Sequence, residues 1–217
     1  MFSGLERQTH SVVLDNCSFL AYTSNNSDSE SRDYMPKARL KLVAPKSVNR
    51  TVPLQAAGDN RYGHRDATMV LIAFRHGLRA SELCDLRWDQ VDFARAALHV
   101  RRAKSGTPST HPLTAREMRA LRRLRREAPT SPFMFVSERG SPFTTAGFAR
   151  MLERAAVSAR LDIKVHPHML RHACGFALAN RGHDTRGLQA YLGHRYIQHT
   201  VRYTELSSDR FKGWWKD

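Results

Sequence analysis

The stretch that decides the fold is HPHMLRHACGFALANRGHDTRGLQAYLGHRYIQHTVRYTEL, residues 166–206. His168 and Arg171 are three residues apart in a segment with helical character, so we expect them to share one helix face. His194 follows a break in this pattern, and Tyr203 lies nine residues further on. The order and spacing therefore allow two histidines, an arginine and a tyrosine to converge in one site.

Two short segments upstream hold the other residues that could take part in chemistry. HGLRASELCDLRW begins at His76 and carries Arg79, with Glu82 three residues later. Three residues are close to one helical turn, so the carboxylate can orient the guanidinium. HVRRAKSGTPSTHPL begins at His99 and places Lys104 in a turn-like segment.

The pattern of apolar residues and chain breakers predicts a mainly α fold with a small antiparallel β-sheet. Apolar positions at helical spacing indicate helices, and two short apolar pieces that flank the turn SGTPS indicate a β-hairpin. In chain order, we expect helices over residues 62–77, 80–86, 114–127 and 144–160, further helices after Pro167, and strands over residues 97–100, 111–113 and 133–136.

Composition favours a polyanion as the partner. The 217 residues include 35 lysines and arginines against 20 acidic residues, which gives a net charge of +15. Such a surplus attracts nucleic acid. No apolar run approaches the roughly 18 residues that span a bilayer, and no secretory signal is visible, so we expect a cytoplasmic protein with no membrane partner.

Cysteine and histidine usage predicts neither disulfides nor a metal. The three cysteines are widely separated and form no CxxC pair. His166, His168 and His172 lie close together, but no cysteine or carboxylate at a matching spacing completes a tetrahedral shell. We therefore expect no metal site.

The three segments that begin at His76, His99 and His166 resemble the tyrosine recombinases, or phage integrase family, and most closely the short fimbrial phase-switch recombinases. The resemblance covers residues 62–215 and rests on the HxLRH box, here HPHMLRH, on YLGH and on the terminal VRYT. It implies the tyrosine recombinase catalytic-domain fold over residues 47–205. A polar arm, residues 1–46, would precede this domain, and a tail, residues 206–217, would follow it and pack on a neighbouring protomer or on its own domain.

The resemblance implies that a tyrosine attacks the scissile phosphate, leaving a 3′-phosphotyrosyl link and a free 5′-hydroxyl, with no metal, ATP or other cofactor. Planar arginine donors suit a phosphodiester whose negative charge grows during attack. A lysine can protonate the departing 5′-oxygen, and histidines can handle the tyrosine proton and a nonbridging oxygen. The implied catalytic set is Arg79, Lys104, His168, Arg171, His194 and Tyr203, with Glu82 and His172 supporting these groups.

Lys104 departs from the family pattern, because its hairpin reads AKSG where GKG is common. This lysine can alternatively be an ordinary contact to the DNA backbone. Other basic residues beside the hairpin and on the helix over residues 114–127 are predicted to contact DNA, or else to form a solvated helix face; they are Arg101, Arg102, Arg119, Arg122, Arg123 and Arg126.

The expected partners are double-stranded DNA and three further copies of the chain, which form a homotetramer on paired DNA sites. The segment before residue 62 is too short and polar for a separate helical DNA-binding domain, so an accessory DNA-bending protein can assist site selection. The reaction can be DNA inversion, excision or integration. Alternatives are an inactive DNA-binding protein with the same fold, a type IB topoisomerase and a basic RNA-binding protein.

Overall fold

The structure is a computed structural model that describes residues 62–103, 106–127, 130–159, 161 and 164–205. Three predictions fall outside these ranges: the arm at residues 1–46, the tail at residues 206–217, and the placement of Lys104.

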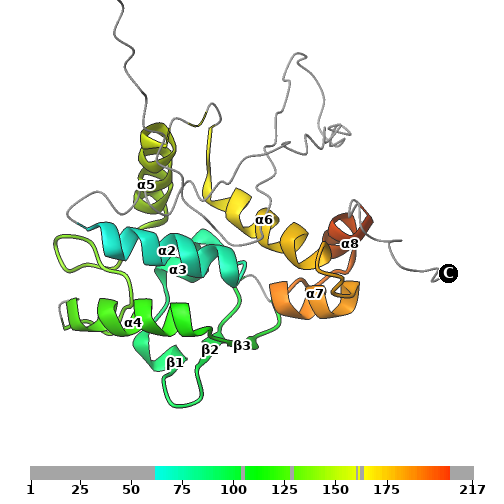
Figure 1. The fold of residues 1–217 in the computed structure, drawn as a ribbon, viewed down its shortest axis with the longest axis horizontal. Helices are drawn as coiled ribbons and strands as arrows, with labels where there is room; N and C mark the ends of the chain where they lie inside the picture. Colours follow the sequence, from blue (N-terminus) through cyan, green and yellow to red (C-terminus); the bar gives the residue numbers. More distant parts are fainter. Residues whose placement is uncertain (1–61, 104–105, 128–129, 160, 162–163, 206–217) are drawn as a thin grey trace, which may run out of the picture.

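The described chain is mostly helical, with one small sheet (Figure 1). The helices are α2 (Gly63–Arg75), α3 (Ala80–Cys84), α4 (Ala115–Glu127), α5 (Thr145–Ser158), α6 (Pro167–Ala179), α7 (Thr185–Leu192) and α8 (Gln198–Glu205), with a 3₁₀ turn at Trp88–Gln90. The strands are β1 (Val91–Asp92), β2 (Ala97–Val100) and β3 (Ser109–Pro112). The predicted fold class is confirmed. Among the described residues, no helix is long and apolar enough to cross a membrane.

The sheet is antiparallel, with β2 between β1 and β3. Leu98 of β2 is paired with Val91 on one side and with His111 on the other. The predicted hairpin is therefore confirmed, although its second strand starts at Ser109, two residues earlier than expected.

The strand predicted over residues 133–136 is wrong. This segment forms only single bridges, Arg87 with Phe133 and Val136 with Pro142. Proline has no backbone N–H, so it cannot extend a ladder by donating to the opposite chain. The apolar run instead reflects burial in the core, where three consecutive side chains ending at Val136 are enclosed.

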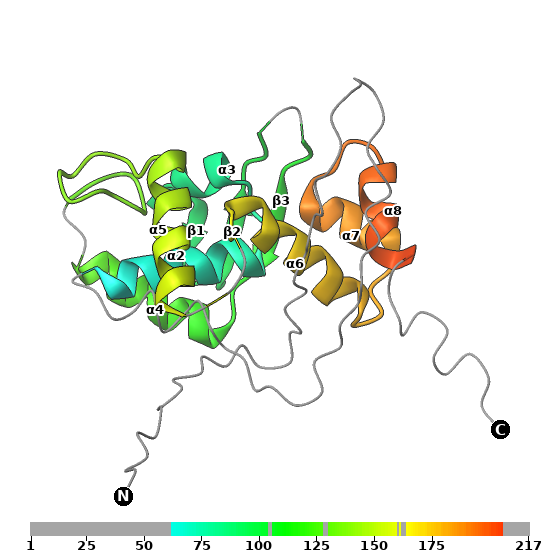
Figure 2. The same ribbon diagram turned by 90° about the horizontal axis from the view of Figure 1, so that it is seen from above.

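Helix α2 is the centre of the main core. Its residues 69–74 are all buried, which means that the helix is enclosed on every side and not on a single stripe. It contacts α3, α4 and α6, and Figures 1 and 2 show it running between them. The carboxyl end of α2, at His76 and Gly77, is therefore held in the middle of the molecule.

A second, smaller apolar cluster joins α6, α7 and α8. It contains Cys174 of α6, Leu188 and Leu192 of α7, and Tyr203 of α8. Because α6 also contacts α2, this helix connects the two clusters (Figure 1). The segments at residues 76–88 and 99–113 are thereby brought close to the segment that begins at His166.

The contact between Gly175 and Tyr203 can be tested by substitution. A Cβ at residue 175 would lie 2.8 Å from Tyr203 Cζ, which is closer than atoms of a packed core approach. We expect Gly175→Ala to lower the free energy of unfolding by about 1–3 kcal/mol through overpacking, measured by urea denaturation.

The matched background is Tyr203→Ala, which removes the ring. In that background Gly175→Ala should be neutral, or stabilising by up to about 1 kcal/mol, because alanine is the better helix former. An equal loss in both backgrounds would contradict the described packing of α8 on α6.

Candidate active site

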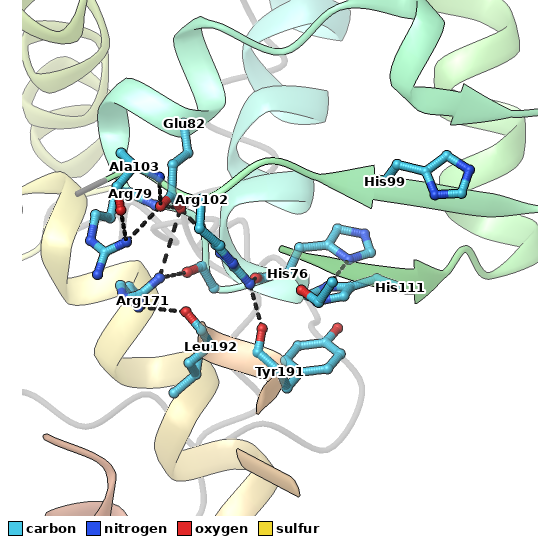
Figure 3. A network of polar contacts seen from close by, with 12 residues as sticks. His76, Arg79, Glu82, His99, Arg102, Ala103, His111, Arg171, Tyr191 and Leu192 are labelled. Atoms are coloured by element: carbon cyan, nitrogen blue, oxygen red, sulfur yellow. Dashed lines mark hydrogen bonds and ion pairs between the residues drawn. The ribbon is translucent and has the colours of Figure 1, made fainter. Parts of the chain in front are cut away.

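The site is built around the buried carboxylate of Glu82 on α3. Its Oε1 accepts hydrogen bonds from Arg79 Nη1 at 2.6 Å and from the Ala103 backbone N–H at 3.0 Å. Its Oε2 accepts from the Arg79 backbone N–H at 3.0 Å and from Arg102 Nη1 at 3.0 Å, and lies 3.9 Å from Arg171 Nη1. Figure 3 shows the three guanidinium groups gathered around this one carboxylate.

The environment keeps Glu82 ionised. Burial acts to raise its pKa, but the hydrogen bond from the Arg79 backbone and the charge of Arg102 act more strongly, and the net result is a lowered pKa. One negative charge thus faces three positive charges. The cluster keeps a net positive charge, which favours binding of a further anion.

The three arginines differ in exposure, which separates their possible roles. The side chain of Arg79 is 24% exposed, whereas those of Arg102 and Arg171 are 0% and 2% exposed. Burial and the charges of Arg79 and Arg102 lower the pKa of Arg171 to about 10, so it stays protonated at neutral pH. The predicted pair Arg79 and Arg171 therefore shares one carboxylate, with Arg79 the more open to a ligand.

Arg171 of α6 is hydrogen-bonded to the ends of two other helices, α2 and α7. Its Nη1 donates to the Gly77 carbonyl, and its Nη2 donates to the Leu192 carbonyl at 2.7 Å. Both acceptors lie at helix ends, where carbonyls lack partners within their own helix. The guanidinium is thus fixed between the ends of α2 and α7 before any ligand arrives.

Tyr203 lies beside two histidines of α6. Its hydroxyl is hydrogen-bonded to His172 Nδ1 at 2.8 Å, and the rings of His172 and His168 meet edge to face with centroids 4.5 Å apart. The phenol is only 2% exposed, and burial raises its pKa in spite of the charge of Arg171. In this conformation the hydroxyl is neutral and held by His172, a contact that the sequence interpretation gave no direct role.

His194 follows the end of α7 and lies beside Tyr203. Its Nδ1 is 2.8 Å from Thr200 Oγ1, and its ring is nearly parallel to that of Tyr203, with centroids 6.3 Å apart. Burial and the charge of Arg171 lower the pKa of His194 to about 3, so the ring is neutral. When Thr200 donates to Nδ1, Nε2 carries the proton and can donate to an oxyanion.

The two arginines after β2 that were predicted to contact DNA differ in their exposure to solvent. Arg101 is exposed and lies 3.7 Å from Asp89. Arg102 is buried, with its guanidinium bound to Glu82 and to backbone carbonyls. Its contact with DNA stays a prediction.

The predicted contacts on α4 are exposed: Arg119, Arg122, Arg123 and Arg126. Arg123 is paired with Glu127 at 2.6 Å. Figure 2 shows α4, which carries these arginines, on the side of α2 away from α3, which carries Glu82. Their contact with DNA stays a prediction.

A buried network next to the site was missed from the sequence. His76 Nδ1 lies 3.0 Å from His111 Nδ1, and His76 Nε2 lies 3.0 Å from Glu117 Oε1, although the geometry of the second contact is not that of a good hydrogen bond. The ring of His111 stacks on Tyr191 with centroids 3.8 Å apart. Burial and the charge of His76 lower the pKa of His111 to about 3. One detectable signal was the Thr114-x-x-Glu117 capping box, in which the Thr114 N–H donates to Glu117 at 2.8 Å.

No group of three or more histidine, cysteine, aspartate or glutamate side chains that could hold a metal ion occurs among the described residues.

A comparison with models of protein families identifies the family of this chain. The phage integrase family model matches residues 48–210, which includes every described residue of the site. The chain belongs to this family. The predicted resemblance to tyrosine recombinases is confirmed, and so is the predicted enzyme class.

Curated relatives in the phage integrase family agree with this assignment. The chain is 37% identical over 196 residues to the type 1 fimbriae regulatory protein FimB of Escherichia coli (strain K12), covering 88% of this chain and 93% of FimB. It is 42% identical over 169 residues to FimE of the same strain, covering 75% of this chain and 85% of FimE. The tyrosine recombinase XerA of Pyrococcus furiosus is 34% identical over 68% of this chain and 52% of XerA.

Solved structures share the fold. A crystal structure of XerA recombinase matches with a TM-score of 0.64 and 27% identity, covering 73% of this chain and 58% of that one. The XerH recombinase bound to its difH substrate matches with a TM-score of 0.62 and 20% identity, covering 83% of this chain and 58% of that one. The chain thus spans about six tenths of the length of these two solved structures.

Replacing Glu82 tests the electrostatic centre of the site. Glu82→Gln leaves three clustered guanidinium groups without a counter-charge, so we expect the free energy of unfolding to fall by about 3–5 kcal/mol. Sulfate should restore more stability to this variant than to the wild type, because the anion can take the place of the lost charge.

The control is Glu127→Gln, which removes one partner of an exposed ion pair and should cost less than about 1 kcal/mol. Urea denaturation with and without sulfate measures both effects. Equal losses in the two variants would contradict a central role for Glu82.

Proposed function

We propose that this protein is a site-specific recombinase that cleaves and rejoins DNA through a covalent 3′-phosphotyrosyl link to Tyr203, without metal or ATP. The observation that carries the proposal is the convergence of the Tyr203 hydroxyl and the neutral His194 ring with the Arg79–Arg171 pair on Glu82. This combination joins a nucleophile to a cluster of cationic donors.

The pocket suits the charge that develops on phosphorus. Attack on a phosphodiester places more negative charge on the nonbridging oxygens, and preorganised donors stabilise that charge most when they need not move. Arg171 is already fixed by two carbonyls, and Arg79 is fixed by Glu82 while remaining partly exposed. In this mechanism both arginines hold the phosphate, and His194 Nε2 donates a hydrogen bond to one of its oxygens.

The chemical step exchanges one phosphoester for another. The Tyr203 oxygen forms a bond to phosphorus while the bond to the 5′-oxygen of the next nucleotide breaks. Once the hydroxyl has left His172, the phenolic proton passes to His168, whose ring meets that of His172. Lys104 protonates the departing 5′-oxygen. A 5′-hydroxyl from a partner strand then attacks the link and restores the phosphodiester.

The described conformation corresponds to a resting state. Tyr203 is buried against α6, so its hydroxyl must leave His172 and turn toward the arginines before attack. α8 carries this tyrosine and contacts α6 and α7. We propose that assembly on DNA supplies the change.

The proposed partners are double-stranded DNA and further copies of the chain. The net charge of +15 favours DNA, and the solved XerH and Tn1549 integrase structures are complexes of those proteins with DNA. We propose a homotetramer on two paired sites in the cytoplasm, with an accessory DNA-bending protein, and with inversion, excision or integration as the outcome.

The nucleophile is tested with nicked duplexes taken from inverted repeats beside the gene. Wild type should form a covalent protein–DNA band on a denaturing gel, and Tyr203→Phe should bind the same DNA without forming it. Binding by both proteins with no adduct on any duplex would favour an inactive DNA-binding protein, and relaxation of plasmid lacking any site would favour a topoisomerase.

The general acid is tested by changing the leaving group. Lys104→Ala should slow cleavage of normal DNA by about 10²–10⁴-fold, the usual contribution of a general acid. Cleavage should recover when sulfur replaces the departing 5′-oxygen, because a thiolate leaves without a proton. Absence of recovery would assign the acid to another residue.

A further inference from the structure

Thr200 of α8 holds the ring of His194 through a buried hydroxyl group. The residue is 0% exposed, and its Oγ1 lies 2.8 Å from His194 Nδ1. Because Nδ1 is engaged by this hydroxyl, Nε2 is the ring nitrogen that remains to meet a phosphate. The sequence interpretation gave Thr200 no role.

The backbone of His194 is held separately, by α7. Gly193 ends this helix in a left-handed conformation, with a φ of 66°, and the His194 N–H donates to the Gln189 carbonyl at 3.0 Å. The Gln189 side-chain amide in turn donates to the His194 carbonyl at 3.1 Å. Since the backbone is bound to α7 and the ring to α8, the orientation of the imidazole depends on Thr200.

One face of α8 carries both Thr200 and the proposed nucleophile. Thr200 and Tyr203 are three residues apart, which is close to one helical turn, and both are buried. The His194 ring lies nearly parallel to that of Tyr203, with an angle of 16° between the ring planes. A single hydroxyl group thus connects the helix of the nucleophile to the histidine that would bind the phosphate.

The hydrogen bond also determines which nitrogen of His194 carries the proton. Burial, together with the charge of Arg171, lowers the pKa of His194 to about 3, so the neutral ring carries one proton at neutral pH. Thr200 is buried, so its hydroxyl hydrogen needs an acceptor within the protein, and Nδ1 supplies one. A proton on Nδ1 would force this hydroxyl hydrogen to find another acceptor. The arrangement that satisfies both groups therefore has the proton on Nε2.

We propose that Thr200 is a positioning residue for His194: its hydroxyl donates to Nδ1, fixes the ring and keeps the proton on Nε2, so that the ring donates to a nonbridging phosphate oxygen. The inference rests on the proposed recombinase function and deepens it. In this role Thr200 acts through His194 and touches neither the phosphate nor the tyrosine oxygen. Without the hydroxyl, the proton can move to Nδ1, and Nε2 then presents a lone pair that repels the phosphate oxygen.

Thr200→Val isolates the hydroxyl, because valine keeps the branched shape of threonine and lacks the donor. Single-turnover cleavage of a nicked duplex should slow by about 10- to 100-fold, which is less than the roughly 10²–10³-fold effect of removing an oxyanion donor outright. Affinity for the uncleaved duplex should change by less than about threefold, because the donor matters most for charge that develops during attack. Thr200→Ser restores the hydroxyl and should recover cleavage to within about threefold of wild type.

The matched control is Thr204→Val on the same helix. The Thr204 hydroxyl also connects α8 to α7, with its Oγ1 2.9 Å from Thr185 Oγ1, and it donates to the Val201 carbonyl at 3.0 Å. Neither partner belongs to the proposed site. We expect Thr204→Val to cleave within about threefold of wild type, because it removes an ordinary hydrogen bond and leaves His194 unchanged. A loss as large as that of Thr200→Val would overturn the proposal, because any support of α8 would then be sufficient.

A double-mutant cycle determines whether Thr200 acts through His194. His194→Phe removes both ring nitrogens, so in this background Thr200→Val should change the cleavage rate by less than about twofold. The same fold loss in both backgrounds would contradict the proposal, because Thr200 would then support Tyr203 or α8 directly.

The tautomer of His194 is a readout that a merely structural role would not move. In the whole chain without DNA, at neutral pH, the NMR chemical shifts of the two ring nitrogens should show a protonated Nε2 and an unprotonated Nδ1. Thr200→Ser should keep this tautomer, whereas Thr200→Val should increase the population with the proton on Nδ1. An unchanged tautomer in Thr200→Val would reject the proposal. If Thr200→Val does not fold, the wild type decides: a protonated Nδ1 rejects the proposal, and a protonated Nε2 supports it.

The wild type distinguishes failure of this inference from failure of the recombinase function. If wild type forms no adduct on any duplex, the proposed function fails, and the nitrogen shifts alone judge the contact between Thr200 and His194. If wild type and Thr200→Val cleave DNA equally well, the recombinase function stands and the positioning role is rejected.

Discussion

The buried carboxylate of Glu82 is the interaction on which the rest of the site depends. Its two oxygens accept from the backbone at Arg79 and Ala103 and from the side chains of Arg79 and Arg102, and it lies 3.9 Å from Arg171. These partners come from the start of α3, the end of β2 and the middle of α6. A single ionised group thus fixes the relative positions of three segments that are distant in sequence, and breaking it would leave buried cations uncompensated.

The three arginines and Tyr203, the proposed nucleophile, are carried by different parts of the fold. The arginines are held by backbone carbonyls at the ends of α2 and α7. Tyr203 instead lies on the short helix α8, in the smaller apolar cluster. In the proposed mechanism, donors that are fixed before the phosphate binds lower the reorganisation needed during the reaction.

The sequence predicted the helices well because their apolar spacing and end residues agree. Pro167 starts α6, and the left-handed Gly193 ends α7, as local backbone rules require. The strand over residues 133–136 was predicted wrongly, since a short apolar run is equally suited to a buried irregular segment. Periodicity measures burial and does not reveal whether a pairing partner exists.

The sequence predicted that the histidines, Arg171 and Tyr203 lie close together, but it did not predict the contacts that each of them makes. Helical spacing placed His168 and Arg171 on one face, yet the same face also carries His172 four residues after His168, and side-chain geometry gave the tyrosine contact to His172. Arg102 was indistinguishable from Arg101 in sequence because both are basic residues after a strand. Alternation along the extended chain turned one side chain to solvent and the other into the core.

The excess of positive charge around Glu82 raises the free energy of the folded protein, and a bound anion would lower it. Three guanidinium groups share one carboxylate, so mutual repulsion is part of the free energy of the unliganded fold. A group that binds only the folded protein stabilises it by mass action. If the DNA phosphate binds here as proposed, its affinity and the conformational stability of the protein are linked, because the bound anion would offset the repulsion among the three guanidinium groups.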